Sequence, residues 1–334
     1  MAKMDKILLG HGSGGKLMHG LIQEYFNPAF GNAGAGDSAV VDVHSQKLAY
    51  TTDSYVVSPL FFPGGNIGDL AVCGTVNDLS VAGAVPLYLT AGFIIEEGFP
   101  LSDLKKIIES MAEAAKQAGV TIVAGDTKVV NKGKADGVFI NTSGIGLLDE
   151  GISISPANIR EGDAVIISGE LGNHSVAILA ERNGLTFDPP IKSDTRPLNS
   201  LVKAMYKATD KIRFMRDPTR GGLATTLKEA ALESGLCIRI REQTLPVPPP
   251  VKGACSLLGL DPLYVANEGI LVAMVDPGVA EKVVSAMRGH EHGKNATVIG
   301  TVDRSAPGMV LLETAAGGSR IIDMLQGEML PRIC

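Results

Sequence analysis

The stretch IGDLAVCGTVNDLSVAGA (residues 67–84) has small and apolar residues at helical spacing, with Asn77 and Asp78 near its middle. This spacing predicts a helix. Before it, KLAYTTD (47–53) has the composition of a strand and ends on an acidic residue. After it, LYLTAGFII (87–95) predicts a buried strand. The helix with its two polar residues therefore belongs to a β-rich half of the chain.

One more helix and two more strands continue this half. SDLKKIIESMAEAAKQAG (102–119) predicts a helix with Ser102 as its N-cap and Gly119 just after its C-terminus. VTIVAGDT (120–127) predicts a strand that leads into an acidic turn. GVFINTSGIGLL (137–148) predicts another strand.

The polar, turn-like segment SPANIREGD (155–163) separates this half from a second one. The Pro-rich LPVPPPV (245–251) is predicted to be neither a helix nor a central strand. The other elements expected in the second half are strands over 164–169, 237–242 and 269–275, a helix capped by Asn173, helices over 197–209 and 278–289, and a turn into a helix over 217–235 that ends at Gly235.

These patterns predict an α+β fold with sandwich-like α/β layers. A length of 334 residues fits two domains of ordinary size. We expect an N-terminal domain over 1–154, a C-terminal α+β domain over 155–323 and a flexible tail over 324–334. The seven residues after Gly327 could extend about 25 Å if fully stretched.

Composition argues against several classes of function. The net charge of −6 and the absence of Trp argue against a nucleic-acid-binding surface. The N-terminal MAKMDKILLG has no apolar core long enough for a signal peptide, and the apolar runs fall short of a membrane span. We therefore expect a cytosolic protein without nucleic-acid or membrane partners.

The four cysteines are expected to be free thiols, because no two of them have a CxxC spacing. Cys73, Cys237 and Cys255 lie in apolar segments and are predicted core residues. Cys334 is the last residue of the sequence, where a thiol would be exposed and reactive. It is therefore a candidate site of chemistry.

A Gly-rich segment near the N-terminus partly matches a phosphate-binding loop. Residues 10–16 spell GHGSGGK, but Leu17 stands where the P-loop motif requires Ser or Thr. The segment is interpreted either as a loop without a ligand or as a lid whose N–H groups and Lys16 approach phosphates.

Five aspartates stand at turns or among small residues rather than on charged helix faces: Asp37, Asp53, Asp78, Asp126 and Asp217. Mg²⁺ is usually held by one or two carboxylates together with phosphate oxygens. The set is typical of a Mg–ATP site without a P-loop, although any one of these aspartates alone is also typical of a turn.

Several of these motifs together resemble a known superfamily. GDSAVVD, TTDSYVVSPLFFPGG, GTVNDLSVAGA, AGDTKVV and RDPTRGGLATTLKE, in this order, are similar to the ATP-binding superfamily of aminoimidazole ribonucleotide synthetase and selenophosphate synthetase. The ending PRIC and the N-terminal HGSGGK resemble the HypE family of hydrogenase maturation proteins. The resemblance covers nearly the whole chain. It implies an N-terminal α/β domain that dimerises and binds ATP near the subunit interface, followed by an α+β domain.

The resemblance also implies roles for individual residues. The acids of GDSA, ND and DPTRGG imply Mg²⁺ ligands at Asp37, Asp78 and Asp217. The TTD, ND and GDT segments imply contacts to the nucleotide or its metal from Asp53, Asn77, Asp78, Gly125, Asp126 and Thr127.

The activity that the resemblance implies takes place on the chain's own thiol. Cys334 would receive a carbamoyl group from the carbamoyltransferase HypF, and ATP would drive dehydration of that group to a thiocyanate. The cyanide would then pass to an iron centre on the HypC–HypD complex. Glu268, an acid among small residues before a predicted strand, is the candidate base, and Lys16 the candidate for stabilising charge on the transferred group.

Two alternatives remain open. One is another ATP-using enzyme of the same superfamily that acts on a diffusible substrate, such as a phosphorylated ribonucleotide. The other is a metallochaperone scaffold that holds nickel or iron through His290, His292 and Cys334. The segment HEHGK (290–294) is more typical of a solvated loop than of a metal site.

Overall fold

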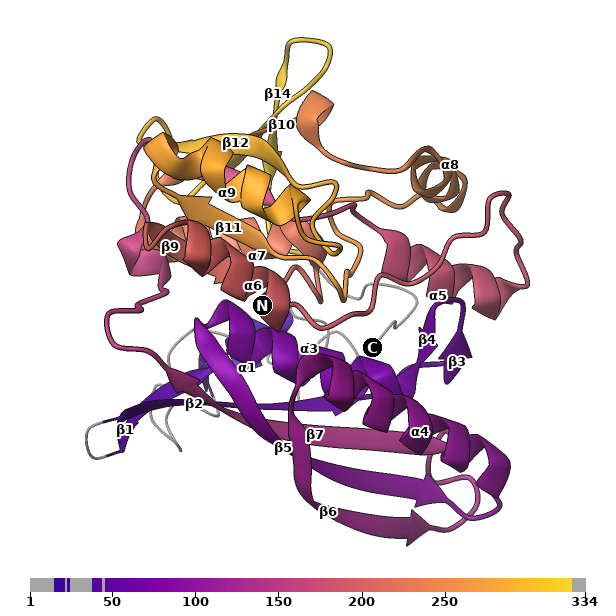
Figure 1. Cartoon of the computed structure of the whole chain (residues 1–334). Helices are drawn as coiled ribbons and strands as arrows, with labels where there is room; N and C mark the ends of the chain where they lie inside the picture. Colours follow the sequence, from indigo (N-terminus) through magenta and orange to yellow (C-terminus); the bar gives the residue numbers. More distant parts are fainter. Residues whose placement is uncertain (1–14, 22, 25–37, 44–45, 326–334) are drawn as a thin grey trace.

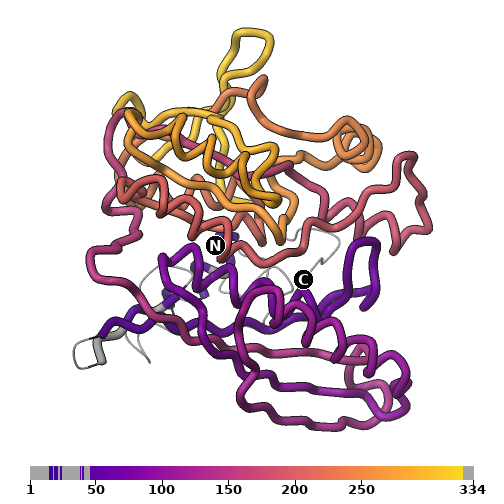
Figure 2. The backbone as a smooth tube through the Cα atoms, viewed as in Figure 1, coloured from indigo at the N-terminus to yellow at the C-terminus, as the bar shows by residue number. Residues whose placement is uncertain are grey.

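The computed structural model describes residues 15–21, 23–24, 38–43 and 46–325 (Figure 1). The chain forms two stacked units, each built on one large β-sheet, as the ribbon and the backbone tube both show (Figures 1 and 2). Its mixture of helices and strands confirms the predicted α+β fold. Among the described helices, none is both long and apolar enough to cross a bilayer.

The first unit has a five-stranded sheet in the order β1-β2-β7-β5-β6, in which β5 and β6 are parallel and the other neighbours antiparallel. Its strands are β1 (Ala39–Val43), β2 (Gln46–Tyr55), β5 (Ala84–Glu96), β6 (Thr121–Val130) and β7 (Val138–Leu148), with a small hairpin of β3 (Phe61–Phe62) and β4 (Gly65–Asn66). Its helices are α1 (Lys16–Leu21), α3 (Ile67–Val81) and α4 (Leu101–Ala118).

Helix α3 is buried on all sides, which explains the apolar character of the stretch 67–84. It packs on β2, β5 and β7, beside α4, and against α6 of the second unit (Figure 1). Its start is fixed by a capping box. The Asn66 side chain accepts from the Gly68 N–H at 2.8 Å, and the Asp69 carboxylate accepts from the Asn66 N–H at 2.6 Å. The helix therefore carries Asn77 and Asp78 to the junction between the units.

The second unit has a seven-stranded sheet in the order β14-β13-β10-β12-β8-β11-β9. Its strands are β8 (Ala164–Ile167), β9 (Ile212–Arg216), β10 (Cys237–Arg241), β11 (Val272–Val275), β12 (Thr297–Asp303), β13 (Val310–Glu313) and β14 (Ser319–Ile322). Its helices are α5 (Asn173–Asn183), α6 (Asn199–Ala208), α7 (Gly222–Ser234), α8 (Pro249–Leu258) and α9 (Ala280–Arg288), with 3-10 turns η3 (Pro156–Asn158), η4 (Glu242–Thr244) and η5 (Pro277–Val279).

Alternate residues of β8 enter two different cores. Val165 and Ile167 pack with α7, whereas Ala164 and Ile166 pack with α6 and α9. The second sheet is therefore covered by helices on both faces. Buried positions for Cys73, Cys237 and Cys255 confirm that these thiols are core residues.

Several local expectations were wrong. Strand β6 continues through the expected acidic turn to Val130, and β5 is buried on one face only. Pro100 and Gly172, not Ser102 and Asn173, occupy the N-cap positions of α4 and α5. Helix α8 begins inside the Pro-rich stretch, because proline in the first turn of a helix lacks only an N–H that would have no partner there.

The face of the first sheet that points away from α3 and α4 carries exposed apolar side chains. Tyr50, Val85, Tyr88 and Ile94 are each 44–53% exposed. Tyr50 and Tyr88 lie in one row, because each is paired with Ile145 of β7. We call these four residues the outer-face patch.

Candidate active site

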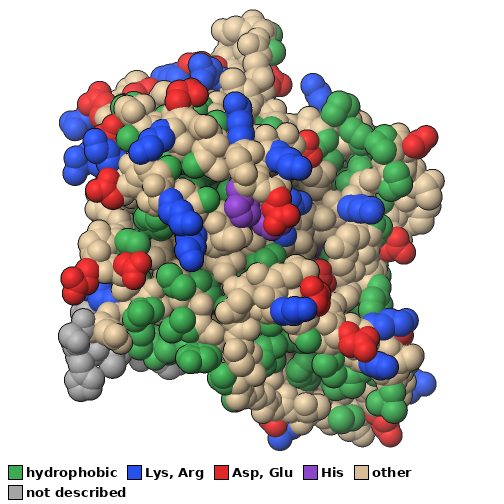
Figure 3. Space-filling model, in the orientation of Figure 1, with side chains coloured by type: hydrophobic (Ala, Val, Ile, Leu, Met, Phe, Trp, Pro, Cys, Tyr) green, Lys and Arg blue, Asp and Glu red, His purple; other side chains and the backbone are tan. Residues whose placement is uncertain are grey.

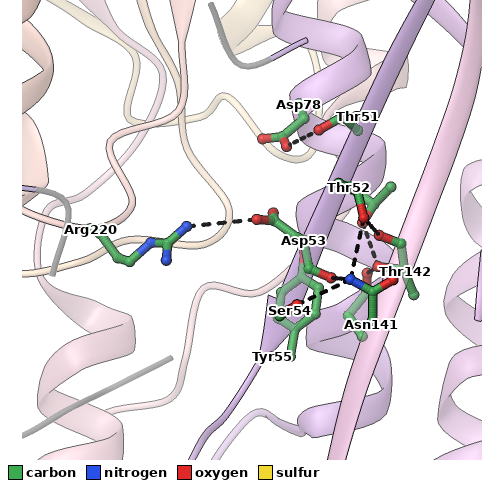
Figure 4. Close-up of polar contacts among 11 residues, drawn as sticks. Thr51, Thr52, Asp53, Ser54, Tyr55, Asp78, Asn141, Thr142 and Arg220 are labelled. Carbon is green, nitrogen blue, oxygen red and sulfur yellow. Dashed lines mark hydrogen bonds and ion pairs between the residues drawn. The ribbon is translucent and has the colours of Figure 1, made fainter. Parts of the chain in front are cut away.

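Two carboxylates come together where β2 meets α3 (Figure 4). Thr51 and Asp53 are two residues apart on β2 and therefore project from the same face of the sheet, the face that α3 covers. The Thr51 hydroxyl donates a 2.7 Å hydrogen bond to Oδ2 of Asp78 on α3. Asp53 thus projects from β2 toward α3, and Asp78 on α3 is bonded to the neighbouring Thr51, so the two carboxylates lie close together between the strand and the helix.

Arg220 reaches this place from the second unit (Figure 4). It lies between β9 and α7, and its Nη2 is 3.7 Å from Oδ1 of Asp53. The Tyr55 hydroxyl donates to the other oxygen of Asp53 at 3.2 Å. Burial raises the pKa of Asp53 above its usual value, although Arg220 and Tyr55 both favour the charged form. We call Thr51, Asp53, Asp78 and Arg220 the junction cluster.

Buried hydroxyl groups support this cluster. Tyr55 is only 5% exposed, and burial raises the pKa of its hydroxyl well above the usual range, so that it remains a donor to Asp53. Nearby, the Thr75 and Thr142 hydroxyls lie 2.5 Å apart. A Cβ atom at Gly74 would collide with the Tyr55 hydroxyl, so only glycine fits at this turn of α3.

Asn77 joins α3 to the second unit. Its Nδ2 donates to the backbone carbonyls of Arg196 and Glu268, each at 3.1 Å, and its Oδ1 accepts from the Leu198 N–H at 2.8 Å. Both amide hydrogens are thus bonded to backbone. The predicted nucleotide contact of Asn77 stays a prediction and would need the remaining lone pair of Oδ1.

Glu268 lies at the same junction with a side chain almost completely buried, at 3% exposure. Its carbonyl is held by Asn77 from the first unit. The candidate base therefore stands next to α3, on the second unit's side of the interface.

The GDT segment lies elsewhere on the first sheet. Asp53 pairs with Thr142, Thr142 with Ala91, and Ala91 with Gly125, so Gly125 is three strands away from Asp53. At about 4.8 Å per strand this separation is about 14 Å. Asp126 is exposed and lies 3.7 Å from Lys128. Within one chain, Gly125, Asp126 and Thr127 are therefore not part of the junction cluster.

Lys16 lies beside the last described residue of the chain. Its N–H donates to the Leu325 carbonyl at 3.4 Å, and the Leu325 N–H donates to the Thr225 hydroxyl on α7 at 3.4 Å. Helix α1 is also fixed to α7, because His19 Nε2 is 2.6 Å from Oε1 of Glu229. That hydrogen bond is the main cause that raises the pKa of His19.

Of the remaining predicted site residues, Asp217 is described by the structure, and two others are not. Asp217 is buried, at 4% exposure, in the loop that also carries Arg220. Asp37 and Cys334 lie outside the described residues. The residue after Asp37, Ser38, donates to the Asp78 carbonyl at 3.2 Å.

The HEHGK segment packs against itself. The rings of His290 and His292 are 5.2 Å apart, edge to face, and His292 Nε2 is 3.7 Å from Glu291. Figure 3 shows histidine side chains beside an acidic one on the front face of the molecule. His292 lines a cavity of about 210 Å³ together with Arg196 and Lys294. In the described part of the chain, no three His, Cys, Asp or Glu side chains are grouped so that they could hold a metal ion.

Sequence reasoning missed Thr51, Tyr55 and Arg220. Thr51 had a signal, because strand alternation puts it on the face of Asp53. Arg220 stood inside the quoted motif RDPTRGG, where only the acid was considered. Tyr55 follows Asp53 by two residues and shares its face by the same alternation.

Comparison with known proteins agrees with this architecture. Residues 35–148 match the family model "AIR synthase related protein, N-terminal domain", and residues 160–310 match that of the C-terminal domain. Carbamoyl dehydratase HypE of Bradyrhizobium diazoefficiens is 54% identical over 330 residues, which cover 98% of this chain and 95% of the relative.

Two solved structures are also similar. A chain of a HypE–HypF complex has a TM-score of 0.86 and 52% identity, covering 91% of this chain and 99% of the other. A HypE structure in complex with ATP has a TM-score of 0.84 and 46% identity, covering 98% and 100%. The chain therefore belongs to the AIR synthase related family and, within it, to the HypE group of hydrogenase maturation proteins.

Proposed function

We propose that this protein is an ATP-dependent carbamoyl dehydratase that converts a carbamoyl group on its own Cys334 into a thiocyanate. The observation that carries the proposal is the junction cluster, which places two carboxylates and a guanidinium between the two units. It is supported by full-length relatives that are named carbamoyl dehydratase HypE and by a related HypE structure that contains ATP.

The acids of the cluster fit a magnesium–nucleotide complex. Asp78 offers hard oxygen donors, and Mg²⁺ needs only one or two carboxylates when phosphates supply the other ligands. Asp78, Asp217 and Asp37 are the proposed metal ligands, with Asp53 and Arg220 beside the phosphates. The ion would neutralise the triphosphate and orient it. Because Gly125, Asp126 and Thr127 lie outside the junction cluster of their own chain, their nucleotide contacts are proposed to be made across the dimer, to the site of the partner subunit.

The reaction needs a better leaving group than hydroxide. The carbonyl oxygen of the S-carbamoyl group attacks the γ-phosphorus of ATP, ADP leaves, and one proton is lost from the nitrogen. The C–O bond then breaks, phosphate leaves with the original carbonyl oxygen, and removal of the second N–H proton completes the C≡N bond. One ATP thus yields ADP, phosphate and the nitrile.

Glu268 is the proposed base for these protons. A carboxylate can accept these protons, and the Glu268 side chain is buried at the junction of the two units, next to α3. Lys16, at the start of α1, is proposed to stabilise charge on the transferred phosphoryl group.

The thiol has enough chain to reach this place. Leu325 is held on α7, the helix that begins two residues after Arg220. Nine residues separate Leu325 from the thiol of Cys334, and nine residues extend to about 30 Å. We propose that 324–334 acts as the tail that carries the thiol, after two domains over 1–154 and 155–323.

Partners follow from the same reaction. The carbamoyl group would come from HypF, and a related HypE has been crystallised with HypF. The cyanide would pass to the HypC–HypD complex. A homodimer is proposed through the outer-face patch, because exposed apolar side chains on an uncovered sheet face favour burial against another chain.

Mass spectrometry of the peptide that contains Cys334 tests this function. After incubation with HypF and a carbamoyl donor we expect a carbamoyl adduct on Cys334, and after addition of ATP the loss of one water from the same residue. Cys334→Ala should abolish both changes, and Cys255→Ala, which alters a buried thiol, should leave them intact. Nitrile formation that persists in Cys334→Ala would overturn the proposal.

A further inference from the structure

The peptide unit that carries Glu268 is held by a buried acid that the proposed chemistry does not use. Asp194 is 2% exposed. Its Oδ1 accepts from the Glu268 N–H at 3.2 Å, and its Oδ2 accepts from the Gly269 N–H at 3.1 Å. One carboxylate thus binds the backbone on both sides of the Glu268 Cα atom.

The other side of this segment is fixed as well. Asn77 donates to the Glu268 carbonyl at 3.1 Å. A Cβ atom at Gly269 would collide with the backbone carbonyl oxygen of Asp194. The two loop segments that carry Asp194 and Gly269 therefore approach each other so closely that only glycine fits at position 269. Three hydrogen bonds and this close approach therefore define the position of the Glu268 backbone.

A carboxylate is a costly way to hold two N–H groups in the protein interior, because burial penalises its charge. Burial is the main cause that raises the pKa of Asp194, while the two backbone N–H groups and Arg196 favour the charged form. The Arg196 Nε also donates to the Asp194 carbonyl at 2.7 Å. Both oxygens of the Asp194 side chain are used in these contacts, which an apolar residue of the same size could not make.

We infer that Asp194 is a positioning residue that fixes the Glu268 peptide so that the Glu268 carboxyl group faces the substrate thiol at the junction of the two units. The inference rests on the proposed role of Glu268 as the base. Asp194 itself touches neither substrate nor nucleotide in this assignment and acts only through Glu268.

The variant Asp194→Asn keeps the size of the side chain but can offer only one carbonyl oxygen to the two N–H groups. Its NH₂ group then faces an N–H donor. We expect the first-order rate of water loss from carbamoylated, ATP-saturated protein to fall about 10- to 100-fold, because small displacements of a catalytic group have effects of this size. The KM for ATP should stay within about threefold of wild type, because this positioning role does not involve the nucleotide.

Asp163→Asn is the matched control. Asp163 is equally buried, at 1% exposure, and accepts from the Arg160 N–H at 2.7 Å and from Arg213 at 2.8 Å. It belongs to the same unit but does not contact Glu268. This variant should lose stability without a selective loss of rate. Equal rates of water loss in the two folded variants would overturn the inference.

Amide hydrogen exchange supplies a readout that does not depend on activity. The N–H groups of Glu268 and Gly269 should lose protection in Asp194→Asn and keep it in Asp163→Asn. Unchanged protection at both positions in Asp194→Asn would contradict the assignment. If Asp194→Asn does not fold, Asp194→Ser removes the charge and leaves a hydroxyl whose hydrogen can rotate away from the two N–H groups, and it gives the same comparison.

A double-mutant cycle with Glu268→Gln separates positioning from an independent role. If Asp194 acts through Glu268, adding Asp194→Asn to Glu268→Gln should change the residual rate less than about threefold. If the rate loss of the double variant equals the product of the rate losses of the two single variants, the inference is overturned. Failure of the wild-type protein to form the nitrile would instead refute the proposed function, while the exchange experiment would still report on the backbone contact.

Discussion

The junction cluster and the GDT segment of β6 carry similar sequence motifs but have different surroundings. Asp53 and Asp78 lie between the two units and have a threonine, a tyrosine and an arginine within contact distance. Asp126 lies on the edge strand of the first sheet, exposed, with Lys128 3.7 Å away. The two regions therefore differ in the surroundings that the fold gives each acid: Asp53 and Asp78 lie at the junction of the two units, and Asp126 is exposed.

The largest expected difference between the two regions is in catalysis. Asp53→Asn and Asp78→Asn should each lower the rate of ATP-dependent water loss by about 100-fold or more, because they remove charge from the proposed phosphate and metal site. Asp126→Asn should lower it by less than about tenfold, because Asp126 lies exposed outside the junction cluster of its own chain and is not a proposed metal ligand. A loss in Asp126→Asn as large as in Asp53→Asn would contradict this difference.

The second-largest expected difference between the two regions is in their contribution to the free energy of unfolding. Asn77→Ala removes a side chain with 0% exposure and leaves two backbone carbonyls and one N–H without their partner, so unfolding should become easier by about 3 kcal/mol. Lys128→Ala, on the edge strand, should change stability by less than about 0.5 kcal/mol. Denaturant unfolding of both variants checks the difference, and equal midpoints would contradict it.

Close backbone approach at the junction gives a smaller effect. Gly269→Ala should destabilise the protein by about 1–3 kcal/mol, since the new methyl group meets the Asp194 carbonyl. Gly253→Ala has open space around its Cβ position on α8 and should stabilise by up to about 1 kcal/mol. Thermal unfolding should show a lower Tm for Gly269→Ala and a higher Tm for Gly253→Ala. A lower Tm for Gly253→Ala would contradict this expectation.

The contact between α1 and α7 should give the smallest effect, and it should depend on pH. Glu229 raises the pKa of His19 in the folded protein, so the stabilising contact is fully present below the unfolded value of about 6.5. It is lost as the pH rises through the folded pKa. Because His19 is 39% exposed, the contribution should be only about 0.5 kcal/mol.

Hydrogen exchange of residues 16–21 at about pH 5.5 and about pH 8.5 measures this contribution, with His19→Gln as a control that should show little pH dependence. Weaker protection of α1 at the lower pH, after exchange rates are divided by the intrinsic rate at each pH, would contradict the expected direction.

Regular elements of the fold were predictable where local signals agreed. The apolar pattern of 67–84 gave α3, and Gly119 and Gly235 follow the ends of α4 and α7 in left-handed conformations. β12 to β14 were not predicted, and β13 and β14 have only four residues each, which is too short for a clear apolar pattern; three of the four residues of β14 are exposed. α8 was excluded because proline was weighed only as a breaker of helices.

The candidate site was predictable only in part, because its residues are brought together by packing between segments that are distant in the sequence. Asp53 and Asp78 were identified from motifs that resemble a family, but their meeting depends on how α3 packs on β2. Asp194 stands 74 residues before the N–H group of Glu268 that it accepts from, in a segment without regular structure. Such a contact between distant loops leaves no local pattern in a sequence.

The central claim is that ATP activates the carbonyl oxygen of the carbamoyl group held by Cys334. The most direct test labels that oxygen with the heavy isotope in the carbamoyl donor, and then follows the label after a single turnover by phosphorus NMR of the released phosphate. The proposed reaction predicts that the label is recovered in inorganic phosphate. Label found in water, with unlabelled phosphate, would contradict it.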